Sequence, residues 1–191
     1  MARWQPGATE RLVIAAVDLF TEQGYDDTTV AQIAERAGVT KSTFFRHFAD
    51  KREVLVAGQG TLSTLLAEGI ADAPATAGPL DAVAGGLERA SSAMGPLNRD
   101  LGPRLKAAVA ASTELQERDA LKSVGLAAAM TTALLARGVP DPTAQLAAEL
   151  GVLAFKRGYA AWSEGERDDT LLAQHALAAL AELRGATATL G

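Results

Sequence analysis

Residues Thr29 to Leu55 read TVAQIAERAGVTKSTFFRHFADKREVL and contain two short helical patterns that meet at Gly38. Thr29 is followed three residues later by Gln32, a capping-box spacing that predicts the start of the first helix. Thr40 is a second N-cap candidate, ahead of a helix that we expect to end near Phe48. Two short helices joined by a glycine turn, the second of them capped, indicate a helix-turn-helix.

The second of these helices has few residues to bury and many polar ones. Phe44 and Phe48 are four residues apart, so both can enter a core from one face. A recognition helix needs short polar residues near its N-terminus to reach base edges, with cations beside them for phosphates. The remaining residues of the helix suit that task and are candidates for DNA contact: Lys41, Ser42, Thr43, Phe45, Arg46 and His47.

The charge of the chain is unevenly distributed. A formal net charge of −5 over 191 residues argues by itself against a nucleic-acid-binding protein. Between residues 36 and 52, however, five basic residues accompany one acidic residue, which gives a local net charge of +4. Fields are screened beyond a Debye length of about 8–10 Å, so this local patch can still hold phosphate.

The composition favours an all-α protein. Hydrophobic residues make up 48% of the chain and aromatic residues 5%, and the abundant alanine and leucine are strong helix formers. Periodicity and caps predict about nine helices, at residues 10–23, 30–37, 41–48, 50–71, 80–94, 103–111, 114–137, 143–162 and 170–184. We expect a three-helix DNA-binding domain at residues 1–50 and a helical effector-binding and dimerisation domain at residues 51–191.

Several classes of site and location are disfavoured by what the sequence lacks. It has no cysteine, which removes disulfides and thiolate metal sites and is compatible with a reducing cytoplasm. His47 and His175 do not form a metal-ligand cluster with obvious carboxylates, so neither metal nor cofactor is expected. The first residues have no signal-peptide core, and no uninterrupted apolar run approaches the roughly 20 residues of a membrane helix. We therefore expect a cytoplasmic protein with no membrane association.

Residues 29–55, with Gly24-Tyr25 before them, closely resemble the N-terminal domain of the tetracycline-repressor (TetR) family. The resemblance covers about residues 9–56, and the rest of the chain matches only in its pattern of helices. It implies a homodimeric transcriptional regulator, most often a repressor, that binds a pseudo-palindromic operator. It also implies that a small-molecule effector enters the C-terminal domain and releases the DNA.

The resemblance also implies a role for each candidate residue. Thr29 and Thr40 would contact phosphate from helix starts, and Lys51 would grip a phosphate. Lys41, Ser42 and Thr43 would face base edges or nearby phosphates, and Arg46 and His47 would lie along the DNA backbone or groove edge. The family usually has tyrosine where this chain has Phe45, so a hydroxyl contact is lost while the ring can still touch a thymine methyl or deoxyribose.

The helix expected at residues 143–162 has a large and a small apolar stripe at helical spacing. The small residues would let a second helix backbone approach closely, so we expect them to face a second copy across a two-fold axis. The last helix would complete a four-helix dimer interface. The interface residues predicted in this way are Ala147, Gly151, Ala154, Gly158, Ala161, Leu172, Ala176, Ala179 and Leu183.

The identity of the effector cannot be read from the sequence. Few aromatic residues and few candidates for buried charges favour a mostly apolar molecule. Each residue that could line its pocket is, taken alone, more often an ordinary core residue; the candidates are Met94, Leu121, Met130, Phe155, Tyr159 and Trp162.

Two other classes of function compete with a DNA-binding regulator. A helical enzyme is disfavoured because the sequence has no glycine-rich phosphate loop, nucleophile motif or zinc-protease spacing. A protein-interaction module with a merely structural helix-turn-helix would leave the +4 cluster without a reason. The sequence does not distinguish a repressor from an activator.

Overall fold

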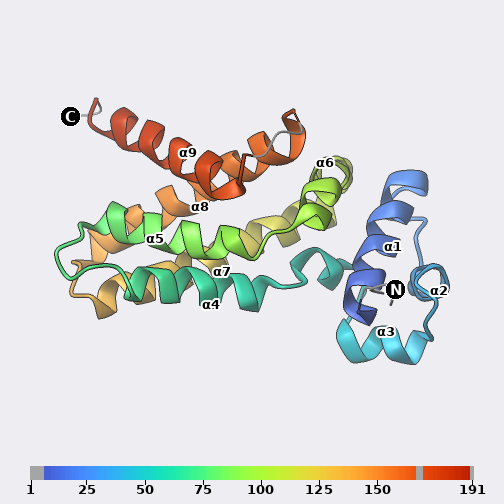
Figure 1. Cartoon of the computed structure of the whole chain (residues 1–191). Helices are drawn as coiled ribbons and strands as arrows, with labels where there is room; N and C mark the ends of the chain where they lie inside the picture. Colours follow the sequence, from blue (N-terminus) through green and yellow to red (C-terminus); the bar gives the residue numbers. More distant parts are fainter. Residues whose placement is uncertain (1–6, 167–169, 190–191) are drawn as a thin grey trace, which may run out of the picture. The chain divides into compact units, whose positions relative to one another are not determined.

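The computed structural model describes residues 7–166 and 170–189. Over these residues the chain forms nine α-helices and one 3-10 helix, η1, with no strand (Figure 1), which confirms the predicted all-α class. The helices are α1 (Ala8–Gln23), α2 (Val30–Arg36), α3 (Lys41–His47), η1 (Lys51–Val56), α4 (Gln59–Ala71), α5 (Pro79–Ser92), α6 (Pro96–Ala111), α7 (Thr113–Ala136), α8 (Asp141–Glu164) and α9 (Leu172–Thr187).

The helices divide into two compact units. The first comprises Met1–Ala57 and Pro103–Leu121, and the second comprises Gly58–Gly102 and Lys122–Gly191. The N-terminal unit therefore includes the second half of α6 and the start of α7 in addition to α1, α2, α3 and η1. The functional division expected at residue 50 stays a prediction, because a compact unit is not by itself a functional domain.

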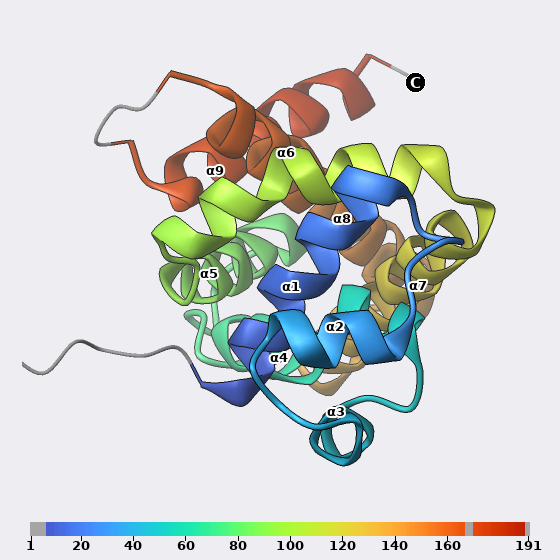
Figure 2. The ribbon, with the colours of Figure 1, turned by 90° about the vertical axis from the view of Figure 1, so that its right-hand side faces the viewer.

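The N-terminal unit is built on a small apolar core to which every helix contributes. Leu12, Ile33 and Phe44, from α1, α2 and α3, are each fully buried. Leu115 of α7 is also fully buried in this core. The short helices α2 and α3 cross steeply, since each is seen end-on in one of the two views in Figures 1 and 2. This crossing leaves one side of α3 outside the core.

Ion pairs add to this core from segments that are distant in sequence. Asp18 of α1 pairs with Arg104 of α6, and Glu53 of η1 pairs with Arg118 of α7 at 2.9 Å. The partners are 86 and 65 residues apart, so no local sequence pattern could have predicted them.

Helix α6 begins earlier than the sequence analysis predicted. We expected a short helix from Pro103, because proline is tolerated in the first turn, where its missing N–H has no intrahelical partner. The helix instead starts at Pro96, and Pro103 lies inside it. The Asn98 side chain accepts a hydrogen bond from the N–H of Gly95 at 3.0 Å, at this start. Because both Pro96 and Pro103 can occupy the first turn of a helix, the sequence alone does not determine which of them begins α6.

The helix predicted over residues 50–71 is two elements. η1 ends at Val56, and Gly58 then adopts a left-handed backbone with φ of +77° as the N-cap of α4. This conformation is open to glycine at little cost. Gly60 has no neighbouring atom within 4 Å of where a Cβ would lie, so Gly58 alone accounts for the break.

In the second unit, α4 and α5 run side by side and approach closely through glycines (Figure 1). A Cβ on Gly69 would lie 2.4 Å from the carbonyl oxygen of Gly85. A Cβ on Gly86 would lie 2.7 Å from the carbonyl oxygen of Leu66. The two backbones therefore meet without side chains between them.

We expect Gly69→Ala to destabilise the protein by about 1–3 kcal/mol, because the new methyl group meets main-chain atoms that must move apart. The matched control is Gly60→Ala on the same helix, where the methyl group enters open space. There the gain in helix propensity should raise stability by up to about 1 kcal/mol. Chemical denaturation measures the free energy of unfolding of both variants. A Gly69→Ala protein as stable as wild type would refute the close approach of the two backbones.

Helices α8 and α9 pack against each other through small residues of the same chain, on the face that the sequence analysis expects to meet a second copy. A Cβ on Gly158 would lie 2.5 Å from the main chain of Ala176, and one on Gly151 would lie 2.7 Å from Val83. Ala154 is fully buried. The other predicted interface residues except the exposed Ala161 are buried as well, namely Ala147, Leu172, Ala179 and Leu183.

A stripe of small residues predicts that some helix approaches closely, but it does not say whether that helix belongs to the same chain or to a second copy. Here α5 and α9 of the same chain occupy this face of α8. These residues are therefore packed within one chain, and the interface between two copies stays a prediction.

Two segments have the length and mean hydropathy of a membrane span, residues 51–71 and 113–136. The sequence analysis expected no such run. The first segment is interrupted by Gly58 and so is not one helix. The second is α7, and one helix of this length and hydropathy is weak evidence for a membrane span.

Candidate nucleic-acid interface

The start of α2 is fixed by a reciprocal cap. The Thr29 hydroxyl accepts a hydrogen bond from the N–H of Gln32 at 3.3 Å, and the Gln32 side chain accepts one from the N–H of Thr29 at 2.8 Å. This is the capping box that the spacing predicted. Thr29 itself is exposed, so its hydroxyl and the N-terminus of α2 can be reached from solvent.

The turn into α3 depends on Gly38. Its φ of +66° lies in the left-handed region, and the N–H of the next residue, Val39, donates to the carbonyl of Ala34 at 2.9 Å. Thr40 then caps α3 by accepting a hydrogen bond from the N–H of Thr43 at 3.1 Å. The geometry is that of a helix-turn-helix, with α3 in the position of the recognition helix.

Helix α3 has a buried and an exposed side. Phe44 is fully buried, and Phe48, which follows the helix, is 7% exposed with its ring 5.6 Å from that of Phe44. Phe45 is 57% exposed, although its ring meets the edge of Phe44 at 5.5 Å. The other predicted contact residues of this helix are exposed except for the half-buried Thr43: Lys41, Ser42, Arg46 and His47.

The positive charges of the cluster are not equivalent. Arg36 makes a two-pronged ion pair with Glu22, at 2.9 and 2.8 Å, and Arg52 pairs with Asp50 at 2.7 Å. Over the described part of the chain, Lys41 and Arg46 make neither a hydrogen bond nor an ion pair. The cations that remain available to a phosphate on α3 are therefore these two.

Asp50 also caps η1, which follows the recognition helix. Its side chain accepts hydrogen bonds from the N–H groups of Arg52 and Glu53 at 2.8 and 3.3 Å. The hydrogen bond from the Arg52 side chain, with these backbone donors, holds the pKa of Asp50 below its ordinary value. Asp50 is thus the N-cap of a short 3-10 helix, at the position where the sequence analysis expects a long helix to begin.

The end of α3 is tied to the start of α1. The Thr9 hydroxyl and Nδ1 of His47 share a hydrogen bond of 3.1 Å. When Thr9 donates, the neutral imidazole carries its proton on Nε2, which can then donate to an external acceptor. Arg11 donates through Nε to the carbonyl of Ala37 at 3.1 Å. The sequence analysis missed Thr9 and Arg11, because partners 38 and 26 residues apart leave no local signal.

Lys51 differs from the other predicted contacts. Its ammonium donates to the carbonyls of Tyr25, Thr28 and Asp26 at 2.5, 2.9 and 3.3 Å. It also lies 4.0 Å from the centroid of the Tyr25 ring. The ammonium of Lys51, which the resemblance assigns to a phosphate, is therefore bound to carbonyls within the N-terminal unit.

The predicted effector residues do not form one group. Phe155, Tyr159 and Trp162 form a row on α8, with ring centroids 6.3 and 5.9 Å apart. Met130 is fully buried and reaches the neighbourhood of Gly151, and Met94 packs at the edge of the same core. Leu121 lies in the N-terminal unit and is 58% exposed, so it does not belong to this group.

The aromatic row holds the start of α6. The Tyr159 hydroxyl donates to the carbonyl of Asn98 at 2.5 Å, and burial raises the pKa of Tyr159 to about 12. The guanidinium of Arg99 lies 5.5 Å from the ring of Trp162. These aromatic residues thus pack within the second unit, and their role toward an effector stays a prediction.

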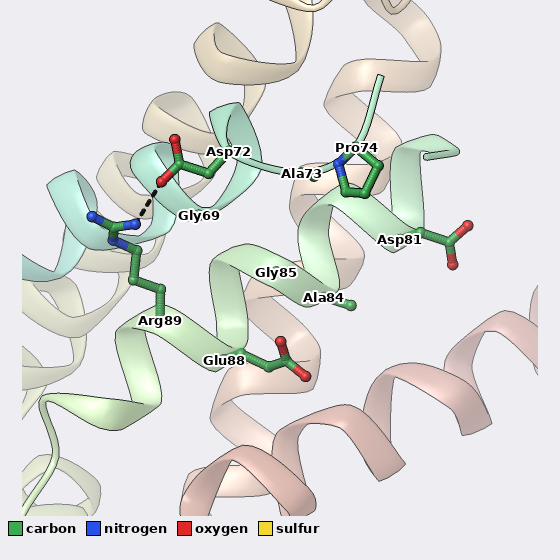
Figure 3. Close-up of a pocket in the computed structure, with 9 residues that line it drawn as sticks. All are labelled: Gly69, Asp72, Ala73, Pro74, Asp81, Ala84, Gly85, Glu88 and Arg89. Carbon is green, nitrogen blue, oxygen red and sulfur yellow. Dashed lines mark hydrogen bonds and ion pairs between the residues drawn. The ribbon is translucent and has the colours of Figure 1, made fainter. Parts of the chain in front are cut away.

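A depression of about 510 Å³ lies where α4 ends and α5 begins (Figure 3). Asp72, Asp81, Glu88 and Arg89 lie on its rim, and the Arg89 side chain bonds to Asp72 at 2.6 Å. It contains none of the six residues predicted to bind the effector. Over the described ranges, no group of three or more histidine and acidic side chains is placed to hold a metal ion.

The family model described as "Bacterial regulatory proteins, tetR family" matches residues 12–57, which hold most of α1, the helix-turn-helix and η1. Residues 12–57 therefore match the N-terminal DNA-binding domain of the tetR family. The chain is 41% identical over 76 residues to the HTH-type transcriptional regulator TcmR of Streptomyces glaucescens, an alignment that covers 40% of this chain and 34% of TcmR. The chain spans 22% to 36% of the length of the first curated relatives that it matches.

Solved structures share the fold beyond this domain. A Syntrophomonas wolfei protein described as a TetR-family transcriptional regulator has a TM-score of 0.61 at 16% identity, over 96% of both chains. Thermus thermophilus FadR, a TetR-family transcriptional repressor in complex with lauroyl-CoA, has a TM-score of 0.52 at 20% identity, over 92% of both chains. At these identities the likeness establishes the fold alone.

Proposed function

We propose that the protein is a ligand-responsive transcriptional repressor that binds a pseudo-palindromic operator as a homodimer and is released by a small-molecule effector. The observation that carries the proposal is the outward side of α3. It presents Lys41, Ser42, Phe45 and Arg46 to solvent from a capped helix in a TetR-family domain. The curated relatives of this domain are HTH-type transcriptional regulators, which favours regulation over an enzymatic role.

Each exposed residue has a proposed task at the DNA. Lys41, Ser42 and Thr43 reach base edges or adjacent phosphates from the N-terminal turn of α3. Arg46 and His47 lie along the backbone or groove edge, and Phe45 offers its ring to a thymine methyl or deoxyribose.

The two helix starts complete the proposed DNA contacts. Thr29 and Thr40 present hydroxyls at the N-termini of α2 and α3, where the first backbone N–H groups favour an anion. Capping uses an acceptor lone pair of the hydroxyl, so its one donor can serve a phosphate. In Thr29 this donor bonds to the Gln32 side chain at 2.9 Å and would turn from it to the phosphate.

The homodimer supplies the second half of the operator contact. One recognition helix reads only a few base pairs, and two copies related by a two-fold axis read both half-sites of a palindrome. The surface that we propose for this contact is a row of leucines on α8. Leu146 and Leu153 are 59% and 45% exposed, and Leu150 between them is half-buried.

Helix α9 continues this surface. Arg157 occupies the next position along the leucine row and pairs with Glu182 of α9 at 3.4 Å. Near Glu182, α9 also exposes the small residues Ala178, Ala181 and Gly185. Leucines next to small residues on two neighbouring helices suit a self-complementary four-helix contact. The surface replaces the buried face that the sequence analysis chose.

The effector is proposed to be a small, mostly apolar molecule that acts on the second unit. The fold of FadR, which this chain shares, holds lauroyl-CoA in that protein. An effector shifts the protein between a DNA-binding and a released state only by its differential affinity for the two states. We propose that the protein works in the cytoplasm, in keeping with regulators of this family.

Selection of duplexes from a random pool by the purified protein tests the proposal. We expect enrichment of an inverted repeat, with half-sites separated by about one helical turn. If no sequence were enriched, specific operator binding would be contradicted. If a single half-site without symmetry were enriched, binding as a dimer would be contradicted.

A further inference from the structure

Lys51 sits in a cage made by one turn of the chain. The three carbonyl oxygens that receive its ammonium belong to Tyr25, Asp26 and Thr28, at 2.5, 3.3 and 2.9 Å. A lysine ammonium has three donors, so these contacts satisfy all of them. The face of the Tyr25 ring, 4.0 Å from the nitrogen, adds a cation–π contact.

The caged turn leads directly into α2. Thr28 is 1% exposed, and its hydroxyl donates to the carbonyl of Gly24 at 2.7 Å. Its N–H donates to the carbonyl of Tyr25 at 3.2 Å. Tyr25 is 9% exposed and packs on Phe20 of α1 with centroids 5.3 Å apart. The next residue is Thr29, the N-cap of α2, so the position of the turn sets the position of that cap.

We propose that Lys51 is a positioning residue for DNA recognition, and that it acts by locking the turn at residues 25–28 and thereby the N-terminus of α2. The inference rests on the proposed DNA-binding function. It assigns Lys51 a different task from Lys41, which is exposed and makes neither hydrogen bond nor ion pair within the described residues.

A direct grip on phosphate would require the cage to open. Three carbonyls would lose the hydrogen bond from the ammonium. The carbonyl of Tyr25 would keep the one from the N–H of Thr28, but the carbonyl of the buried Thr28 has no second donor within the described residues. A phosphate gains one charge-assisted contact in return, whereas a buried acceptor left unpaired bears its full desolvation penalty. The closed cage therefore persists when DNA is bound, and the charge of Lys51 acts on the DNA only through the geometry of α2.

Lysine methylation of the full-length protein, read residue by residue by mass spectrometry, tests the cage. The chain has five lysines, so Lys51 and the exposed Lys41 are compared within one sample. We expect Lys51 to react at least about tenfold more slowly than Lys41 without DNA, because hydrogen bonds to its charged group must break first. A mixed-sequence duplex at low salt should slow the methylation of Lys41 and leave the methylation rate of Lys51 unchanged.

The outcomes separate the inference from the function that it rests on. Fast reaction of Lys51 without DNA, or protection of Lys51 only when the duplex is added, would overturn the cage. Failure of the duplex to protect Lys41 would count against the proposed DNA contact, while a slow Lys51 in the same sample would still support the cage.

A variant distinguishes positioning from a role in folding alone. Lys51→Met keeps most of the side-chain length and removes the ammonium. At a temperature where this variant is folded, we expect about a tenfold lower affinity for the selected operator, with the salt dependence of wild type, since no phosphate contact is lost. Unchanged affinity, or a salt slope reduced by about 0.9 for each protomer, would overturn the proposal.

Lys51→Arg provides a rescue test. A planar guanidinium directs its donors in a fork and cannot converge on three carbonyls around one point, but it binds phosphate well. We therefore expect no rescue of operator affinity by arginine. Full affinity in Lys51→Arg would instead show that Lys51 touches the DNA.

Discussion

Operator affinity falls by about a hundredfold to ten-thousandfold when Lys41 is replaced by glutamate. Lys41 is exposed at the first position of α3 and has neither hydrogen bond nor ion pair within the described residues. A hydrogen bond to a charged group is worth about 1.5–3 kcal/mol, and a symmetric dimer loses two of them. Loss of two phosphate contacts should also reduce the slope of log K against log salt by about 2.

Lys106→Glu is the matched control for this substitution. Lys106 is an exposed lysine on α6, and its reversal changes the net charge by the same amount. We expect its effect on affinity to stay within about threefold, because a distant surface charge is screened. Circular dichroism should show both variants folded. Equal losses for the two variants would mean that net charge, and not α3, governs binding.

The dimer dissociates about a thousandfold more readily when Leu153 is replaced by glutamate. Leu153 is 45% exposed on the outer row of α8, next to the pair formed by Arg157 and Glu182. A two-fold axis places the new carboxylate in the interface twice. Each carboxylate weakens the free energy of dimerisation by about 2 kcal/mol, because a poorly paired polar group replaces an apolar contact. Sedimentation equilibrium measures the shift from dimer to monomer.

Val124→Glu serves as the control for the dimer surface. Val124 is a 64% exposed apolar residue on α7, outside the row proposed for the interface. We expect this variant to remain dimeric and to keep its operator affinity. Sedimentation that finds Leu153→Glu as dimeric as wild type would refute the α8 surface. Substitution of the fully buried Ala154 would test folding and not assembly.

Local chemistry made the helix-turn-helix predictable from sequence. Thr29 and Thr40 cap the helices that follow them, and Gly38 turns between them, because each of these effects depends on residues at most five positions away. The burial of Phe44 and the exposure of Phe45 likewise follow from their positions on one short helix.

Long-range contacts were not predictable for the same reason. Lys51 carries the same charge as Lys41, and only the fold brings the carbonyls of residues 25–28 around it. The small stripe with Ala154 correctly indicated a close helix contact, but the partner is α9 of the same chain and not a second copy. Proline is rare inside a helix, so the sequence predicts that a helix starts at Pro103. In the structure Pro103 lies inside α6.

The measurement that tests the central claim most directly is equilibrium binding of the protein to its selected duplex, titrated across salt concentration. With Lys41 and Arg46 of two protomers at the DNA, log K should fall linearly with log salt with a slope of about −2 to −4. A scrambled duplex of equal length should bind at least about a thousandfold more weakly. Equal affinity for both duplexes, or affinity that does not change with salt, would contradict operator recognition by α3.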